Sequence, residues 1–270
     1  MTTTSFLATM LSAPSDFAFQ IEKDFDPTES AAFMRSHWHI PLSFLFAFVL
    51  LIALGPGVMA KREKAFDLQM PLAAWNAFLC IFSCIGMCKT VPYVLTMPFE
   101  HIVCSNPMDS WGPGVTGFWV CIFAFSKIPE LIDTVFIVLR RKPLIFLHWY
   151  HHITVCLFCW SAYSTLDGSG LYFVAMNFSV HALMYGYYCL QALQLLPKSF
   201  PAVIITLAQI AQMFVGTGVC CACWYYSLTG VPCHNEKKNL IAGAIMYASY
   251  LYLFCEFAVK RFLRPKKVKK

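Results

Sequence analysis

Seven long apolar stretches divide this chain of 270 residues. Each of them is long enough to cross the hydrocarbon core of a lipid bilayer, which is about 30 Å thick. The stretches cover residues 40–60, 68–91, 115–139, 144–163, 171–196, 201–228 and 240–263. With 59% hydrophobic and only 13% charged residues, the composition is typical of a multi-pass membrane protein and not of a soluble domain. The sequence therefore predicts an all-α polytopic membrane protein with seven spans.

The apolar stretches form one predicted domain, residues 40–263, between two terminal segments. Residues 1–39 are polar, show no signal-peptide pattern, and are expected to be irregular. Of the lysines and arginines in the connecting segments, 14 lie on one side of the membrane and 5 on the other. Because an excess of positive charge stays in the cytosol, we expect a lumenal or outer N-terminal segment and a cytosolic C-terminus.

The last segment, residues 264–270, is a basic tail. The simplest interpretation is a positive anchor for the last span. The tail could also contact anionic lipid or an anionic ligand, or act as a dibasic retrieval signal. The third residue from the end is Val268, which does not fit the usual retrieval spacing well.

Most of the 13 cysteines lie inside the apolar stretches, where a free cysteine behaves as a small hydrophobic residue. Two groups are spaced like redox or zinc motifs, but packing explains them better because no second pair stands at metal spacing. Cys104 and Cys233 differ, since both fall in loops on the predicted lumenal side. An oxidising lumen permits a disulfide between them, and the residues alone leave a bridge and two free thiols equally open.

The fourth stretch contains three histidines, His148, His151 and His152. On an α-helix, the spacing i, i+3 and i+4 places the three imidazoles on one face, within one turn. Ionisable groups inside a bilayer are costly and usually mark function. The pattern therefore predicts chemistry within the membrane.

Three further spans carry polar residues at helical spacing, which predicts that four polar stripes line one internal cavity. In the third span, Lys127 and Glu130 are placed to form an ion pair that reduces the cost of burying each charge. The full set of stripe residues in these spans is Lys127, Glu130, Asp133, Thr134, Asn177, His181, Tyr185, Thr206, Gln209 and Gln212.

Clustered histidines suit two chemistries. Imidazoles bind iron, copper and zinc, and membrane desaturases and hydroxylases use similar boxes for paired iron. However, only His148, His151, His152 and His181 lie in spans here, which is too few for a di-iron site. A histidine can instead act as nucleophile or general base, and nearby amides can stabilise an oxyanion. That second combination suits acyl transfer.

The same motifs carry a family resemblance. The chain resembles the ELO family of very-long-chain fatty acid elongases in Lys127-x-x-Glu130-x-x-Asp133-Thr134, His148-x-x-His151-His152, Asn177-x-x-x-His181-x-x-Met184-Tyr185 and Thr206-x-x-Gln209-x-x-Gln212, in family order. The likeness runs from about Trp38 to Arg264. The sequence around the histidines is similar to the branch that elongates saturated and monounsaturated chains of about sixteen carbons.

The resemblance implies a seven-helix fold in which spans two to seven form a barrel around a narrow acyl tunnel, sealed toward the lumen. It implies condensation of a long-chain acyl-CoA with malonyl-CoA to a 3-oxoacyl-CoA two carbons longer, with release of CO2 and CoA. No metal or redox cofactor is needed for that reaction. The resemblance also implies the disulfide between Cys104 and Cys233, and a multi-pass protein of the endoplasmic reticulum membrane.

The residue roles are hypotheses. His151 is the candidate nucleophile, with His181 and His152 orienting it or moving protons, and with Asn177 and Asp133 fixing tautomers. The candidate donors to the developing charge are Gln209, Gln212 and His148. The candidate substrate-binding residues are Lys127, Glu130, Thr134, Tyr185, Lys198 and Arg264, of which Lys198 and Arg264 belong to a basic rim that could steer CoA.

Two rival interpretations remain beside the metal box. Soluble condensing enzymes use a cysteine nucleophile, and Cys156 stands one turn beyond His152. A seven-helix receptor or transporter fits the spans but gives no reason for the histidines. The expected partners are acyl-CoA, malonyl-CoA, membrane lipid and the reductase, dehydratase and enoyl reductase of the elongation cycle. Nucleic acid is not expected, and a homodimer is compatible with the sequence. We expect residues near 91–97 and 220–224 to set the depth of the tunnel.

Overall fold

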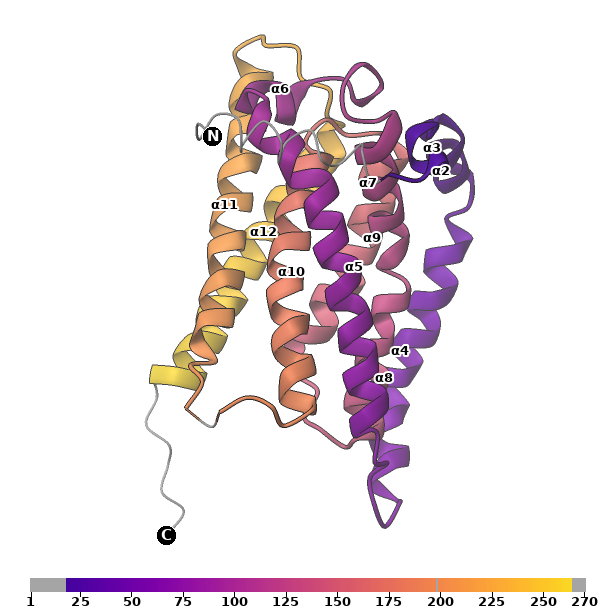
Figure 1. Ribbon diagram of the computed structural model, residues 1–270, viewed down its shortest axis with the longest axis vertical. Helices are drawn as coiled ribbons and strands as arrows, with labels where there is room; N and C mark the ends of the chain where they lie inside the picture. Colours follow the sequence, from indigo (N-terminus) through magenta and orange to yellow (C-terminus); the bar gives the residue numbers. More distant parts are fainter. Residues whose placement is uncertain (1–17, 198, 264–270) are drawn as a thin grey trace.

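The computed structural model describes residues 18–197 and 199–263, and within these residues it contains helices but no strands. Figure 1 shows a bundle of long helices that run roughly parallel or antiparallel to its long axis. The long elements are α4 (His39–Ala60), α5 (Gln69–Thr96), α7 (Gly114–Ser126), α8 (Ile132–Leu139), α9 (Phe146–Ser164), α10 (Gly170–Ala192), α11 (Val203–Leu228) and α12 (Lys237–Ala258). A short π-helix, η3 (Val259–Leu263), continues α12. The all-α prediction is confirmed.

Within residues 18–197 and 199–263, four segments are both long and apolar enough to cross a membrane: α4, α5, α11, and α12 together with η3. They correspond to the first, second, sixth and seventh predicted spans. The third predicted span is interrupted, while α9 and α10 carry the polar stripes that lower their mean hydropathy. The chain is thus a multi-pass membrane protein by its apolar helices, and the count of seven spans stays a prediction.

The sequence had suggested one continuous helix for the third predicted span, but the structure shows an interruption. Helix α7 ends at Ser126, a 3-10 turn η2 (Pro129–Leu131) follows, and α8 begins at Ile132. Pro129 is the cause, because it lacks the N–H that an α-helix requires and its ring disfavours a helical preceding residue. The break falls between Lys127 and Glu130, two residues of the predicted polar stripe.

The helices pack on one another in a series that returns to its start. The packed pairs are α5 with α10, α10 with α11, α11 with α12, α12 with α9, α9 with α7, and α7 with α5. Helix α4 stands outside this series at the edge of the bundle in Figure 1, where it packs only on α8 and α9 among the long helices. An apolar core of aromatic residues, including Trp119, Trp160 and Phe178, fills the space near the end where α7 begins.

The N-terminal segment is more ordered than expected. It contains α2 (Gln20–Lys23) and α3 (Pro27–Ser36), which lie at one end of the bundle beside α7 (Figure 1). Asp26 caps α3 by accepting a hydrogen bond from the Thr28 N–H at 2.8 Å. An Asp-Pro pair at a helix start is a known local signal, so the expectation of irregular structure was wrong for this part of residues 1–39.

Buried contacts fix these short helices to the bundle. Glu22 accepts a hydrogen bond from the Trp119 indole at 2.8 Å and pairs with Lys89 at 3.6 Å. The Trp160 indole donates to the main-chain oxygen of Met34 at 2.7 Å. Because Trp119 and Trp160 belong to α7 and α9, the N-terminal helices act as a cover over that end of the bundle.

A second cover at the same end is held by a disulfide between Cys104 and Cys233. Cys104 is the last residue of α6 (Phe99–Cys104), which is followed by a 3-10 turn η1 (Pro107–Asp109). Cys233 lies between α11 and α12. The disulfide expected from the family resemblance is therefore confirmed, and it joins two connections that are 129 residues apart.

Candidate active site

A polar cavity lies among α8, α9, α10, α11 and α12. Its empty volume, including open space at its mouth, is about 860 Å³. The polar side chains that line it are Glu130, Asp133, His148, His151, His152, Asn177, His181, Tyr185, Tyr188, Gln209 and Gln212. The four predicted polar stripes therefore meet in one cavity, as the helical spacing had indicated.

Two of the expected substrate-binding residues do not line the cavity. Lys127 and Thr134 are fully enclosed, with 2% and 0% of their surfaces exposed. Each instead supports a residue that does line it. Lys127 is paired with Glu130, and the hydroxyl of Thr134 shares a hydrogen bond of 2.8 Å with the His148 Nε2 atom. The structure thus gives Lys127 and Thr134 a supporting position behind the cavity wall, and contact with substrate stays a prediction.

The Lys127 ammonium lies in a cradle of acceptors. It donates to the Glu130 Oε1 atom at 2.6 Å and to the Asn177 Oδ1 atom at 3.5 Å. Its charge also lies 3.8 Å from the centroid of the Phe123 ring, a favourable cation–π position. Ser126 adds a second donor to Glu130 at 2.9 Å. The predicted ion pair is confirmed, and it links the break after α7 to α10.

The sequence had suggested that Asp133 fixes a histidine tautomer, but its carboxylate bonds to other residues. Its two carboxylate oxygens accept hydrogen bonds from the Trp75 indole at 2.6 Å and from the Tyr185 hydroxyl at 2.8 Å. Asp133 thereby joins α5, α8 and α10. Asn177 likewise directs its oxygen toward Lys127, whereas the hydroxyl of Thr134 bonds to the His148 ring.

Two buried polar atoms at the cavity have no hydrogen-bond partner within the described ranges, Glu130 Oε2 and His152 Nδ1. An unpartnered buried polar atom is costly, and in a native site it usually has an explanation such as a catalytic role or a bound group. Both residues line the cavity. They are therefore positions at which an incoming ligand could complete the hydrogen bonding.

Like His152, the His151 and His181 imidazoles are not held by hydrogen bonds to described residues, in contrast to His148, which bonds to Thr134. Both line the cavity, and no hydrogen bond within the described part of the chain engages their ring nitrogens. His151 lies within electrostatic range of His181, Lys127, Glu130 and His148. Free ring nitrogens at a cavity wall are available for attack on a bound group or for proton transfer.

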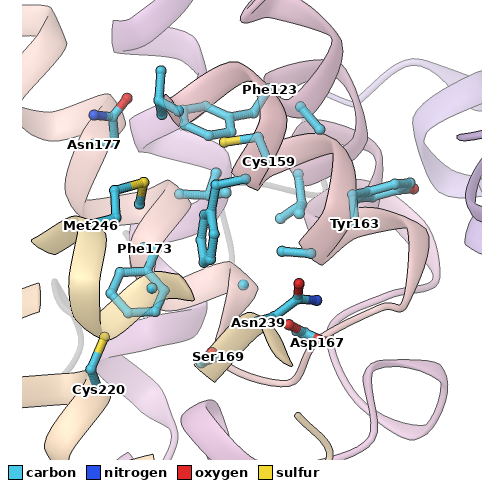
Figure 2. Close-up of a pocket in the computed structure, with 18 of the residues that line it drawn as sticks. Phe123, Cys159, Tyr163, Asp167, Ser169, Phe173, Asn177, Cys220, Asn239 and Met246 are labelled. Atoms are coloured by element: carbon cyan, nitrogen blue, oxygen red, sulfur yellow. The ribbon is translucent and has the colours of Figure 1, made fainter. Parts of the chain in front are cut away.

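A second cavity, with an empty volume of about 830 Å³, lies nearer the covered end of the bundle. Its wall is largely apolar, with side chains such as Phe123, Phe173, Cys220 and Met246 (Figure 2). Asn177 lies at one end in Figure 2, and Asp167, Ser169 and Asn239 lie at the other. Asn177 also lines the polar cavity, so this residue belongs to the walls of both cavities.

The far end of the apolar cavity is closed by polar groups that bond to one another. The Asn239 side chain accepts from the Ser161 hydroxyl at 2.7 Å and donates to Thr165 at 3.0 Å. Asp167 accepts from the Thr165 hydroxyl at 2.8 Å. Of the two regions expected to set the depth of a tunnel, Cys220 and Cys223 line this cavity, whereas residues 91–97 do not.

A family model described as the ELO, or GNS1/SUR4, family matches residues 33–270. This covers most of the chain and the whole of both cavities. The chain belongs to the ELO family. The motifs that suggested the resemblance are the ones that the fold brings together around the polar cavity.

Curated relatives support the same assignment to the ELO family. The chain is 40% identical over 243 residues to "Putative fatty acid elongase 3" of Caenorhabditis elegans, covering 87% of this chain and 74% of that protein. It is 39% identical over 249 residues to "Very long chain fatty acid elongase 6" of Gallus gallus, covering 91% and 92% of the two chains. The protein with the same description from Homo sapiens is 38% identical over 251 residues, again covering 91% and 92%. This ELO family member is thus a fatty acid elongase of the condensing, 3-oxoacyl-CoA synthase class.

The elongase site also contains residues that the sequence analysis missed. Trp75 gave no signal, because a single tryptophan in an apolar span resembles any lipid-facing or packed aromatic residue. Tyr250 was detectable in principle, since Tyr247, Tyr250 and Phe254 form an i, i+3, i+7 stripe on α12. All three of these α12 side chains are buried toward the interior of the elongase.

Two predicted CoA-binding residues of the elongase, Lys198 and Arg264, lie outside the described residues. The described basic residues of the predicted rim are Arg140, Arg141, Lys142, Lys260 and Arg261. They follow α8 or lie within η3, at the end of the bundle where α9 begins. The polar cavity reaches toward this end, because Ile145, Tyr188 and Phe257 line it.

The alternatives gain no support from the elongase structure. Among the residues described, no three His, Cys, Asp or Glu side chains are arranged to hold a metal ion. Cys156 is 1% exposed and packs with Leu45, Phe48 and Leu131, facing α4. It lines neither of the two cavities, so a cysteine nucleophile would have no access to substrate from this position.

Proposed function

We propose that this chain condenses a long-chain acyl-CoA of about sixteen carbons, saturated or monounsaturated, with malonyl-CoA through an acyl group carried on His151. The observation that carries the proposal is that a histidine-lined cavity and an apolar cavity lie next to each other and share Asn177 in their walls. The apolar cavity suits the acyl chain, and the polar cavity suits the thioester and the malonyl group. The relatives named very long chain fatty acid elongase 6 support fatty acid elongation as the reaction.

In the first half-reaction, a ring nitrogen of His151 attacks the thioester carbon of the acyl-CoA. The carbon–sulfur bond breaks, and the leaving CoA thiolate takes the proton that the imidazole loses. The acyl group then remains on His151 as an acyl-imidazole. His181 lies within electrostatic range of His151 and has free ring nitrogens, so it is placed to pass this proton.

In the second half-reaction, malonyl-CoA loses CO2, and the electron pair that is left attacks the acyl carbon. A carbon–carbon bond forms and the carbon–nitrogen bond to His151 breaks. His151 takes up a proton in place of the one given to CoA, so that the overall reaction consumes one proton. Gln209, Gln212 and His148 line the cavity and are placed to stabilise the enolate oxygen.

The walls of the site protect the acylated histidine. An acyl-imidazole reacts with water, and the apolar cavity and the covered end of the bundle limit the approach of water to it. No metal or redox cofactor takes part in these steps. The packing series of α5, α7, α9, α10, α11 and α12 supports a barrel formed by spans two to seven around the tunnel.

The same proposal includes an orientation in the endoplasmic reticulum membrane. The disulfide and the closed end of the apolar cavity would face the lumen, where oxidising conditions favour the bridge. The basic residues Arg140, Arg141 and Lys142 would face the cytosol and steer both anionic CoA substrates to the opening. The reductase, dehydratase and enoyl reductase of the elongation cycle would act on the product.

The test is an assay of the purified protein with palmitoyl-CoA and radiolabelled malonyl-CoA, measuring CO2 release and 3-oxoacyl-CoA. We expect His151→Ala to lower turnover by a factor of about a thousand or more, as removal of a nucleophile does. Cys156→Ser is the control and should keep its activity, because Cys156 faces α4. Retained turnover in His151→Ala would exclude the acyl-histidine. Stoichiometric iron without any condensation would overturn the proposed function.

A further inference from the structure

Tyr250 of α12 contacts the proposed nucleophile at two points. The centroids of its ring and the His151 imidazole lie 5.1 Å apart, with an angle of 46° between the planes. Its hydroxyl donates a hydrogen bond to the main-chain oxygen of His151 at 3.2 Å. Only 2% of the Tyr250 surface is exposed, so these contacts are fixed by the packing of α12 on α9.

The hydroxyl of Tyr250 is fully occupied by the protein. Besides the His151 main chain, it shares a hydrogen bond of 2.5 Å with the Thr154 hydroxyl. The main-chain oxygen of Tyr150, 2.7 Å from the Thr154 hydroxyl, is an alternative acceptor for the Thr154 proton. Tyr250 does not line the polar cavity. It therefore cannot donate a proton to a substrate there, and any effect on the reaction must act through His151.

The orientation of the His151 ring depends on packing. No hydrogen bond within the described residues holds its nitrogens, whereas the His148 ring has a fixed bond to Thr134. The rings in contact with His151 are those of Tyr250 and His152, with a centroid separation of 5.5 Å for the latter. The Tyr250 ring is itself braced edge-on by Tyr150, at 5.9 Å.

We propose that Tyr250 is a positioning residue that holds the His151 imidazole in the orientation required for attack on the thioester. The ring sets the rotation of the imidazole, and the hydroxyl bond to Thr154 and the His151 main chain keeps the ring in place. This inference rests on the proposed function, in which His151 is acylated. A nucleophile misplaced by about 1 Å can lose about a hundredfold in rate, so loss of this contact should slow acylation.

The experiment measures acyl-enzyme formation from palmitoyl-CoA alone, by intact mass, in Tyr250→Leu, Tyr250→Phe and Ser249→Ala. Ser249 is the matched control, because its hydroxyl makes the neighbouring α12-to-α9 hydrogen bond, to Tyr150 at 3.0 Å, without touching His151. The thermal stability of each variant, and the kcat and KM for palmitoyl-CoA in the complete reaction, are measured in parallel.

We expect Tyr250→Leu to slow acylation and lower kcat by about tenfold or more, with KM within about twofold of the wild-type value. Tyr250→Phe keeps the ring and should lose about threefold, and Ser249→Ala should acylate at the wild-type rate. If Tyr250→Leu does not fold, the difference between Tyr250→Phe and Ser249→Ala decides the matter.

Two outcomes would overturn the inference. Acylation at the wild-type rate in both folded Tyr250 variants would show that the contact does not position His151. A loss in Ser249→Ala equal to that in the Tyr250 variants would show a purely structural effect of the α9–α12 contact. A wild-type protein that forms no acyl-enzyme would overturn the acyl-histidine proposal itself, which is a distinguishable result.

Discussion

The two cavities of this protein share the residue Asn177 but are built in opposite ways. The polar cavity is supported by paired groups behind its wall, such as Lys127 with Glu130 and Thr134 with His148. The apolar cavity is shaped by side-chain volume. In its wall, the Phe158 ring packs closely against Gly243. Loss of a partner should therefore damage the first, while added volume should damage the second.

This difference indicates that the polar cavity matters most for the stability of the fold, and the apolar cavity for the selection of the ligand. Buried charges cost free energy unless they are paired, so the polar cavity tolerates few substitutions among its supports. An apolar wall tolerates changes that conserve volume, but it excludes any ligand that would overlap with an added side chain. The predictions below test this contrast, beginning with the largest expected effect.

The first prediction concerns the supports of the polar cavity. Lys127→Met should lower the free energy of unfolding by about 3–5 kcal/mol, because it leaves the Glu130 carboxylate buried without its partner. The control is Lys260→Met, which breaks the exposed pair of Lys260 with Glu256 at the same 2.6 Å separation. That exposed pair should contribute at most about 1 kcal/mol.

Thermal unfolding of the purified variants in detergent measures both effects. The double variant Lys127→Met with Glu130→Gln should recover part of the lost stability, since no unpaired charge remains. Equal losses in the buried and exposed single variants would contradict the conclusion that buried paired charges support the polar cavity.

The second prediction concerns the wall of the apolar cavity. A β-carbon added at Gly243 would lie 3.2 Å from the Phe158 Cζ atom, so Gly243→Val should narrow the cavity. Overpacking of this kind costs about 1–3 kcal/mol, and the turnover of palmitoyl-CoA should fall by about tenfold while that of octanoyl-CoA changes little.

Gly218→Val is the matched control, because no heavy atom of another residue lies within 4 Å of a β-carbon placed there. Rates with the two acyl-CoAs are compared for each variant. An equal loss with both chain lengths would mean that Gly243 supports the fold and does not border the path of the acyl chain.

The third and smallest prediction concerns the polar floor of the apolar cavity, in the connection between α9 and α10. Burial raises the pKa of the Asp167 carboxyl above its ordinary value near 3.8, against the opposing effect of its hydrogen bonds. The native state then keeps this proton to a higher pH than the unfolded state does. Stability should therefore fall as the pH rises from about 3.8 through the raised pKa, and the penalty should be fully present above it.

Asp167→Asn should remove this part of the pH dependence, because an asparagine oxygen can still accept from Thr165 and carries no charge. The melting temperature of both proteins is measured from about pH 3.5 to about pH 8. This range begins just below the ordinary carboxyl pKa of about 3.8 and extends above the raised pKa. Parallel curves would show that Asp167 has the same pKa in both states.

Much of the candidate site could be read from the sequence, because helical spacing decides which residues share a face. His148, His151 and His152 on α9, and Asn177, His181 and Tyr185 on α10, reach one cavity as predicted. The disulfide expected from the family resemblance and the pairing of Lys127 with Glu130 are also confirmed. Two local predictions were wrong: Pro129 breaks the third predicted span, and Asp26 caps a helix, α3, in a segment expected to be irregular.

The sequence by itself determined the family, the apolar helices and the polar faces, since these depend on composition and on the period of a helix. Only the tertiary structure decided which faces meet and what supports each group. Asp133 has two hydrogen-bond partners, Trp75 and Tyr185, which are 58 and 52 residues away from it along the chain. Tyr250 contacts His151 across 99 residues. No local pattern encodes such contacts, because they depend on how separate helices pack.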